Sequence, residues 1–491
     1  MVRQRLSKLT LYRYRYLFAY VGFALALAIM LFVAGFYLPG GLTRAEINSA
    51  LISDDLNPAR LFSLQPDQLI YLPYRLLQAG SIALFGISTI SIKLPSIILG
   101  FVSALGILYL LNLWYHRSVA IIVATIAITT NQFLLSSQAG QAGILYIFLT
   151  TMILIAASMV TRRTAYAQIW LIVGFILAAI SLYVPLSLYM LVALVLTAAI
   201  HPHARDLLFR QASKATIFVG SVLFLIIISP LVLGIVNDQG IIKTLLGIPE
   251  TLSNFGSNAS SLALNYVNFA HPASGSIITP VYGLGLALLI LLGVYRLVSA
   301  KYTTKSYIVS FWLVLLIPLV CLNPSFISIT FIPVLLLIAF AVDYLISSWY
   351  DLFPHNPYAR VFGLLPLGVL MIGLVVSSID RYSYGLHYDR AVYASYTYDT
   401  SILQESLRAF DTDKPIQLIV SSKNVNFYRS LAAHQSYIKQ LSVSSDASLV
   451  NHAPVTIVER ELKNNVQKIP SNILVARTAQ NADRFYVYKN K

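Results

Sequence analysis

Apolar and polar positions are grouped in long blocks along this chain. Runs of about 17–25 mostly apolar residues, the length with which a helix spans a bilayer, recur from Tyr16 to Ile379. We predict about eleven spans: Tyr16–Leu38, Leu94–Trp114, Ser118–Leu135, Ile144–Val160, Ile169–Val184, Leu186–Ile200, Ala215–Val236, Ile277–Tyr295, Tyr307–Leu322, Phe326–Ala341 and Val361–Ile379. The pattern is typical of an α-helical polytopic membrane protein.

Charge placement predicts how these spans are oriented. A further apolar stretch, Leu69–Ile87, carries Arg75 and Pro73, and it can be a span or an interfacial helix. If it does not cross, basic residues collect on the side of the N-terminus: Arg3, Arg5, Lys8, Arg13, Arg15, Arg117, Arg162, Arg163, Arg205, Arg210, Lys214, Arg296, Lys301, Lys305 and Arg360. The positive-inside rule therefore favours a cytoplasmic N-terminus and an interfacial or re-entrant helix over Leu69–Ile87.

This topology divides the chain into two parts. Residues 1–379 form a transmembrane domain whose first extracytoplasmic loop is 39–93, and residues 380–491 form a small extracytoplasmic α/β domain. In the second part "PIQLIVSS", "VTIVE", "NILVAR" and "RFYVYK" are predicted strands, and "SILQESLRAF" and "NVNFYRSLAAH" are predicted helices. We expect a multi-pass protein of the cell membrane.

Composition agrees with a lipid environment. Hydrophobic residues make up 57% of the 491 and charged residues 11%, against about a quarter charged in soluble domains. The net charge of +15 is dispersed over short turns, which argues against a nucleic-acid partner. Phosphate-binding loops, His-Glu-x-x-His and Gly-x-Ser-x-Gly are absent from the sequence, and the Asp-x-Asp of "FDTDK" (Phe410–Lys414) is interpreted as a solvated turn.

The segment after the first span places a carboxylate at the membrane surface. In "LPGGLTRAEINSALIS", Thr43 and Glu46 have the spacing of a capping box, so Glu46 can serve as a structural cap. Arg44 stands beside it, and a carboxylate and a cation at this position can also act on a substrate. Both interpretations stay open at this point.

A longer motif leads into the second span. "LFGISTISIKLPSIILGFVSALGILYLL" begins with Leu84, Phe85 and Gly86 and continues to a Lys-Leu-Pro-Ser step. This resembles the GT-C glycosyltransferases that use polyprenyl-phosphate sugars, the superfamily of the protein O-mannosyltransferases and the lipid A aminoarabinose transferases. The matching residues of the step are Lys93, Leu94, Pro95 and Ser96, and the resemblance covers roughly residues 1–160.

The chain departs from the family's pattern at three places. The usual Asp-Glu becomes Ala45-Glu46, or Gly40-Gly41 in a gap-free register that makes Glu46 a later acidic position. In "LQPDQLIY" Gln65 replaces a lysine. In "SSQAGQAG", where an arginine is common, the chain has Gln138 and Gln141.

The resemblance implies sugar transfer from a polyprenyl-phosphate donor to an extracytoplasmic acceptor. It makes Glu46 the general base or a ligand of a divalent cation, and Asp55 or Asp67 can replace the missing aspartate. Candidate partners of the donor phosphate are Arg44, Arg60, Arg75 and Lys93.

Two other functions remain as alternatives: a GT-C-fold scaffold that has lost its chemistry, and a lipid or glycan transporter. Transport is disfavoured because the predicted spans contain few ionisable residues. If the enzyme hypothesis holds, we expect Glu46 to line the largest outward-facing cavity. At least one of the four cations should then lie within a side-chain length of its carboxylate.

Overall fold

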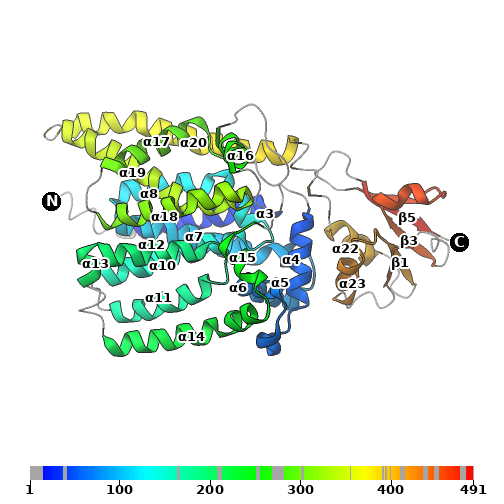
Figure 1. Cartoon of the computed structure of the whole chain (residues 1–491). Helices are drawn as coiled ribbons and strands as arrows, with labels where there is room; N and C mark the ends of the chain where they lie inside the picture. The colour runs from blue at the N-terminus through cyan, green and yellow to red at the C-terminus, as the bar shows by residue number, and fades with distance from the viewer. Residues whose placement is uncertain are drawn as a thin grey trace.

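The long helices lie side by side in one bundle, and a small α/β domain lies beyond one end of it (Figure 1). This computed structural model describes residues 15–36, 41–162, 166–206, 213–249, 255–267, 281–299, 303–353, 355, 357–389, 392, 395–396, 398, 400–409, 415–434, 441–446, 453–475 and 483–489. The N-terminal basic residues before Arg15 and the whole of "FDTDK" (Phe410–Lys414) lie outside the described residues.

The bundle is built from long apolar helices. Its longer members are α3 (Arg15–Phe36), α7 (Thr89–Trp114), α8 (Arg117–Thr129), α10 (Gly143–Thr161), α11 (Ala167–Ser181), α12 (Ser187–Ile200), α14 (Lys214–Asn237), α17 (Leu284–Ser299), α18 (Thr304–Leu322), α19 (Phe331–Leu352) and α20 (Pro357–Tyr388). Shorter helices connect them: α13 (Pro202–Asp206), α15 (Gly240–Leu246), α16 (Phe255–Val267) and η3 (Pro324–Thr330). The prediction of a helical polytopic membrane protein with a small C-terminal sheet is confirmed.

The structure has fewer helices of full membrane-spanning length than the sequence pattern predicts. Within the described residues 6 helices are long and apolar enough to cross a membrane, or 7 if a bent pair counts as one. Four further apolar helices are shorter, at 10–17 residues: Tyr20–Phe36, Ala167–Ser181, Ser187–Ile200 and Leu284–Ser299. The predicted count of about eleven is therefore not confirmed.

The bent pair corrects one predicted span. Ser118–Leu135 is not a single helix, because α8 ends at Thr129 and α9 (Asn131–Gln138) leaves it at 61°. Thr130 is extended at the break and its side chain accepts a hydrogen bond from the Phe133 N–H, which makes it the N-cap of α9. Polar residues at this point give the backbone another hydrogen-bonding choice than a continuous helix.

Four short helices form the first loop: α4 (Arg44–Asp54), η1 (Pro58–Ser63), α5 (Pro66–Leu69) and α6 (Leu72–Phe85). They gather at the end of the bundle that faces the α/β domain (Figure 1). With 14 residues, α6 is shorter than a typical span, which needs about 20. That the whole first loop stays on one side of the membrane remains a prediction.

The α/β domain holds one sheet of β1 (Ile416–Ile419), β2 (Leu441–Ser444), β3 (Val455–Glu459), β4 (Asn472–Val475) and β5 (Asp483–Lys489). The strand order is β2-β1-β3-β5-β4; β1 pairs in parallel with β2 and β3, and β5 pairs antiparallel with β3 and β4. Helices α22 (Thr400–Ala409) and α23 (Val425–Ala433) and the turn η5 (Arg460–Asn465) complete it. The four predicted strands and both predicted helices are confirmed, while β2 was not predicted.

The first loop and the α/β domain share one hydrophobic core. Leu42, Ile47 and Ile82 of the loop are buried in a cluster with Leu403 and Leu431 of the domain. Polar contacts join the same surfaces. Leu42 and Tyr398 form an antiparallel bridge, Thr89 Oγ1 lies 3.0 Å from Thr400 Oγ1, and the Asp54 carboxylate accepts from Ser430 Oγ and lies 3.3 Å from His434 Nε2. The domain is thus anchored on the loop.

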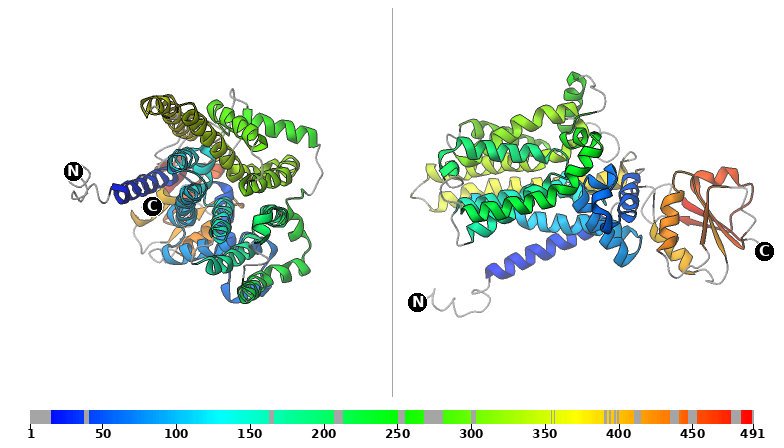
Figure 2. Two further views of the ribbon diagram at one scale, coloured as in Figure 1. Left: turned by 90° about the vertical axis from the view of Figure 1, so that its left-hand side faces the viewer. Right: turned by 60° about the horizontal axis from the view of Figure 1, so that its bottom comes forward.

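The two ends of the bundle are distinct. Helix α3 begins at the end remote from the α/β domain and runs along the edge of the bundle towards it (Figure 2). The predicted division at Ile379–Asp380 and the extracytoplasmic location of the α/β domain stay predictions, although α20 continues as one helix to Tyr388.

Candidate functional site

Glu46 is fixed by its own helix and by the turn after α9. It is the third residue of α4, and the Thr43 N–H donates to Glu46 Oε2 at 2.6 Å while the Glu46 N–H donates to Thr43 Oγ1 at 3.3 Å. The predicted capping box is confirmed. Its second oxygen, Oε1, accepts from the Gly140 N–H at 2.7 Å. The side chain is 0% exposed.

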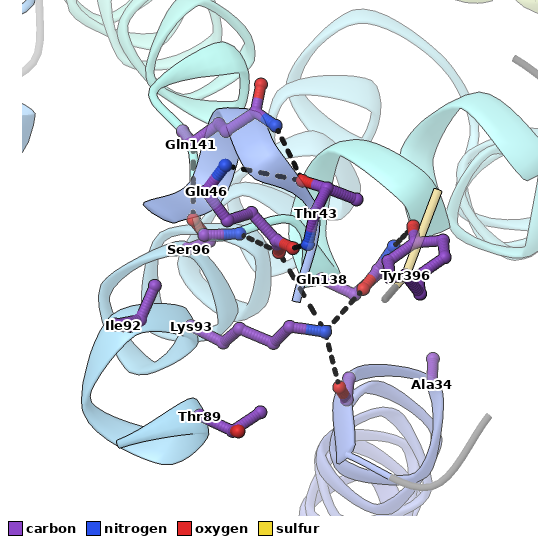
Figure 3. A network of polar contacts seen from close by, with 12 residues as sticks. Ala34, Thr43, Glu46, Thr89, Ile92, Lys93, Ser96, Gln138, Gln141 and Tyr396 are labelled. Atoms are coloured by element: carbon purple, nitrogen blue, oxygen red, sulfur yellow. Dashed lines mark hydrogen bonds and ion pairs between the residues drawn. The ribbon is translucent and has the colours of Figure 1, made fainter. Parts of the chain in front are cut away.

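Lys93 is the cation that meets this carboxylate. It lies in the early turns of α7, is 0% exposed, and places Nζ 3.8 Å from Glu46 Oε1 (Figure 3). The ammonium also donates to the Gly35 carbonyl at 3.1 Å and to Gln138 Oε1 at 3.3 Å. The expectation that one of four named cations lies within a side-chain length of Glu46 is confirmed.

Gln138 and Tyr396 extend the network to the segment before the α/β domain. Gln138 Nε2 donates to the Tyr396 hydroxyl at 2.8 Å, and Lys93 Nζ lies 5.5 Å from the centre of the Tyr396 ring (Figure 3). Burial raises the pKa of Tyr396, and the Glu46 carboxylate raises it further, so the hydroxyl stays protonated. The sequence offered no signal for Tyr396.

The glutamine at position 138 suits the buried lysine. An arginine there, which the resemblance leads one to expect, would set a second cation against the Lys93 ammonium in a buried site. The neutral amide instead accepts from Lys93 with its oxygen and donates to Tyr396 with its nitrogen. The substitution and the burial of Lys93 are therefore physically linked.

Gln78 holds the loop helices to the bundle. Its side chain is 0% exposed, and its amide nitrogen donates to the Ile92 and Gly140 carbonyls, each at 3.1 Å. Its oxygen accepts from Ser49 Oγ at 2.9 Å and from Ser53 Oγ at 2.8 Å. One buried amide thus connects α4, α6, α7 and the turn after α9 with every bond satisfied.

Arg75 is a second buried cation among the candidate residues, and it lies within the first loop. Arg75, 9% exposed, donates through Nε to the Ile70 carbonyl at 2.9 Å. Burial lowers the pKa of its guanidinium, and the Asp67 carboxylate offsets part of that effect. Between them Tyr71 adopts φ 62° and ψ 26°, a left-handed conformation that is rare for a bulky residue. Its N–H donates to the Tyr183 carbonyl at 2.9 Å.

The remaining predicted site residues stand apart from the Glu46–Lys93 pair. Arg44, Arg60 and Asp55 are exposed, as is Asp67. Among the candidate residues in the described part of the chain, the structure joins Glu46 and Lys93 in an ion pair, whereas Asp67 acts on Arg75 through its charge alone. Gln65, where the resemblance expects a lysine, is the exposed N-cap of α5 and takes no part in the Glu46–Lys93 pair.

The predicted cavity at Glu46 is not found. A side chain with no exposed surface contacts no space large enough for water, so Glu46 cannot line an outward-facing cavity in this conformation. The expectation is wrong because the polypeptide itself supplies the partners: two backbone N–H groups and an ammonium occupy the carboxylate oxygens. The sequence could not show which backbone groups would reach them.

The hydrogen-bond donors around Glu46 also decide whether its carboxylate can bind a metal ion. A divalent cation needs free oxygen ligands, whereas the Glu46 oxygens face positive hydrogen-bond donors, so this donor set does not fit a metal ion. Among the described residues, no group of three or more His, Cys, Asp or Glu side chains is placed to hold one.

Close backbone approach at Gly140 gives a testable prediction. A Cβ at Gly140 would lie 2.6 Å from Ile92 Cγ2 and 3.1 Å from the Ile92 carbonyl oxygen, whereas a Cβ at Gly143 would meet nothing within 4 Å. We expect Gly140→Ala to lower the free energy of unfolding by about 1–3 kcal/mol through overpacking. Thermal unfolding in detergent measures this, with Gly143→Ala as the matched control. Equal stability of the two variants would contradict the packing.

Comparison with solved structures covers nearly the whole chain. No protein-family profile and no curated protein sequence matches it. The crystal structure of ArnT from Cupriavidus metallidurans in the apo state superposes with a TM-score of 0.52 and 12% identity, covering 96% of this chain and 98% of ArnT. The chain has the ArnT fold. ArnT bound to undecaprenyl phosphate gives 0.50, 10% identity and the same coverage of 96% and 98%.

An archaeal oligosaccharyltransferase is also similar. The enzyme from Archaeoglobus fulgidus, crystallised with zinc and sulfate, superposes with a TM-score of 0.47 and 13% identity, covering 89% of this chain and 68% of that one. The fold that the motif ending in Lys93–Ser96 led us to expect is therefore shared with ArnT.

Proposed function

We propose that this protein is a membrane glycosyltransferase that moves a sugar from a polyprenyl-phosphate donor to an extracytoplasmic acceptor. The observation that carries the proposal is the ArnT fold, which extends over 96% of the chain and includes the α/β domain. ArnT has been crystallised with undecaprenyl phosphate, which supports a polyprenyl lipid as the donor's carrier.

The reaction requires a base and a cation on the same side of the membrane. An acceptor hydroxyl oxygen forms a bond to the anomeric carbon, and the bond from that carbon to the phosphate oxygen breaks. Polyprenyl phosphate leaves with the electron pair, and the hydroxyl proton passes to a carboxylate. A positioned carboxylate supplies the proton acceptor, and a guanidinium stabilises the departing phosphate.

Asp67 and Arg75 are the carboxylate and the cation that best meet these requirements. Asp67 is exposed, so an acceptor can reach its carboxylate, and its charge acts on the Arg75 guanidinium. The strained Tyr71 lies between them in the chain. Backbone strain of this kind is kept where a surrounding structure enforces it, often at active sites. Asp55, also exposed, is the alternative base.

In this proposal Glu46 and Lys93 have a structural role and take no direct part in the reaction. Their buried pair ties α3, α4, α7 and the turn after α9 together beneath the loop. Every carboxylate oxygen of Glu46 already has a partner, which leaves no face for an acceptor. A direct role of Glu46 as general base stays a prediction, and it would require α4 to move.

A second candidate function is a scaffold of the same fold without transfer chemistry. It is favoured by a specific observation: the carboxylate that the resemblance places at the centre of the reaction is fully buried and hydrogen-bonded. Such a protein would bind the carrier lipid or the acceptor without turning the donor over.

The deciding experiment uses the full-length protein in nanodiscs with a panel of radiolabelled polyprenyl-phosphate sugars. Time-dependent release of polyprenyl phosphate together with transfer of label to an acceptor is the expected result. Donor binding without turnover across the panel would replace the enzyme by the scaffold. If the protein neither bound nor turned over any donor, both the glycosyltransferase and the scaffold hypotheses would be wrong.

A further inference from the structure

A cavity lies at the end of the bundle remote from the candidate functional site. Its volume is about 360 Å³, and it opens between the end of α7, the end of α10 and the start of α18. The lining residues of greatest chemical interest are Trp114, Ser158, Arg162, Thr303, Thr304 and Lys305. The reaction proposed above makes no use of it.

The polar wall of the cavity carries two cations. Arg162 Nη2 donates to the Leu113 carbonyl and Lys305 Nζ donates to the Trp114 carbonyl, which are acceptors in the last turn of α7. Trp114 Nε1 donates to Ser158 Oγ at 2.7 Å, and Lys305 Nζ lies 4.3 Å from the centre of the Tyr115 ring. These contacts hold both cationic side chains at the mouth of the cavity.

Neither of these carbonyl contacts uses all the hydrogen-bond donors of its cation. A guanidinium has five N–H donors and an ammonium has three, so each side chain retains donors for an anion. Thr303 caps α18 by accepting from the Ser306 N–H at 3.2 Å, and the positive end of this 19-residue helix points the same way. Among the described residues that line the cavity there is no carboxylate, and Asp343, whose charge acts on Lys305, is not one of them.

The other wall is apolar and continues into the bundle. Leu113, Leu154, Ala157 and Ile308 contribute it, and the three helices that carry them are long and apolar enough to span the membrane. A cationic mouth above an apolar wall at the level of helix ends matches a lipid headgroup above its acyl chains. Basic pockets between spans commonly hold anionic headgroups on the cytoplasmic side, where the positive-inside pattern places this end.

We propose that this cavity binds the phosphate of an anionic membrane lipid, with Arg162 and Lys305 as the phosphate ligands. The lipid would join α7, α10 and α18 at the cytoplasmic surface. This site is independent of the proposed sugar transfer, because it lies at the opposite end of the bundle.

Lipid retention tests the proposal. Delipidated full-length protein is incubated with phosphatidylglycerol or with phosphatidylcholine of the same acyl chains, and bound lipid is counted by native mass spectrometry. We expect selective retention of phosphatidylglycerol, and a loss of at least about tenfold in its affinity in the double variant Arg162→Gln/Lys305→Gln, because charge-assisted bonds are lost. Lys214→Gln removes one charge at the same end outside the cavity and should change the affinity little.

Two further arms keep the result decisive. Ala157→Leu fills the cavity and leaves both cations in place, so it should reduce retention even if the double variant fails to fold. Inorganic phosphate, added as a competitor at millimolar concentration, should not displace the lipid. Equal retention by the Ala157→Leu and wild-type proteins, or displacement by inorganic phosphate alone, would overturn the lipid assignment.

Discussion

Lys93→Met is expected to lower the free energy of unfolding by about 3–5 kcal/mol, the usual cost of removing one partner of a buried ion pair. The variant leaves the Glu46 carboxylate buried without its cation and leaves the Gly35 carbonyl and Gln138 Oε1 without the ammonium donor. Methionine nearly matches the length of the lysine side chain, so loss of charge and hydrogen bonds dominates over loss of volume. Chemical or thermal unfolding of the purified protein in detergent measures the effect.

A double-mutant cycle separates the pair from its surroundings. Adding Glu46→Gln to Lys93→Met removes the uncompensated charge, so the double variant should be more stable than the sum of the two single effects predicts. Exposed Lys243→Met is the matched control and should shift stability by no more than about 0.5 kcal/mol. If Lys93→Met proved as stable as that control, the pair would hold nothing together.

The transmembrane part was predictable where composition alone decides structure. Long apolar runs located most helices, since only helices satisfy the backbone in lipid. The break at Thr130 was missed because the surrounding residues are apolar enough to average as one span. Its local signal was present in the run Thr129–Gln132, where Thr130 becomes an N-cap. In the α/β domain β2 was missed because Leu441–Ser444 is only four residues long and half of them are serine.

The sequence predicted which residues belong to the site better than it predicted how they are arranged. A cation beside Glu46 was expected, but which one depends on how the loop folds over α7, and the loop's own positive charges, Arg44 and Arg60, turn to solvent. The prediction of a cavity at Glu46 was wrong for a related reason. Thr43 and Gly140 reach Glu46 through backbone N–H groups, which every residue carries and no sequence pattern distinguishes. Tyr396 enters from beyond α20, where the sequence gives no hint of a return to the loop.

The largest kinetic effect should follow from Asp67→Asn in the labelled-donor assay. If Asp67 takes the acceptor proton, its amide cannot, and turnover should fall by about 10²–10⁴-fold, the usual contribution of a general base. Stability should change little, because Asp67 is exposed at the start of α5. Glu461→Gln, an exposed carboxylate of the α/β domain, is the control and should leave the rate unchanged.

Parallel variants decide which carboxylate acts. Glu46→Gln places an amide nitrogen against either the Thr43 or the Gly140 N–H, so we expect a loss of folded protein, with activity per folded molecule reduced less than about tenfold. A loss of 10²-fold or more per folded molecule in Glu46→Gln, with Asp67→Asn near the wild-type rate, would return the base to Glu46 and require α4 to open during the reaction. The same loss in Asp55→Asn would assign it to Asp55. Because stability and turnover are measured on the same samples, a structural role and a catalytic role give opposite patterns: Glu46 changes the first, Asp67 the second.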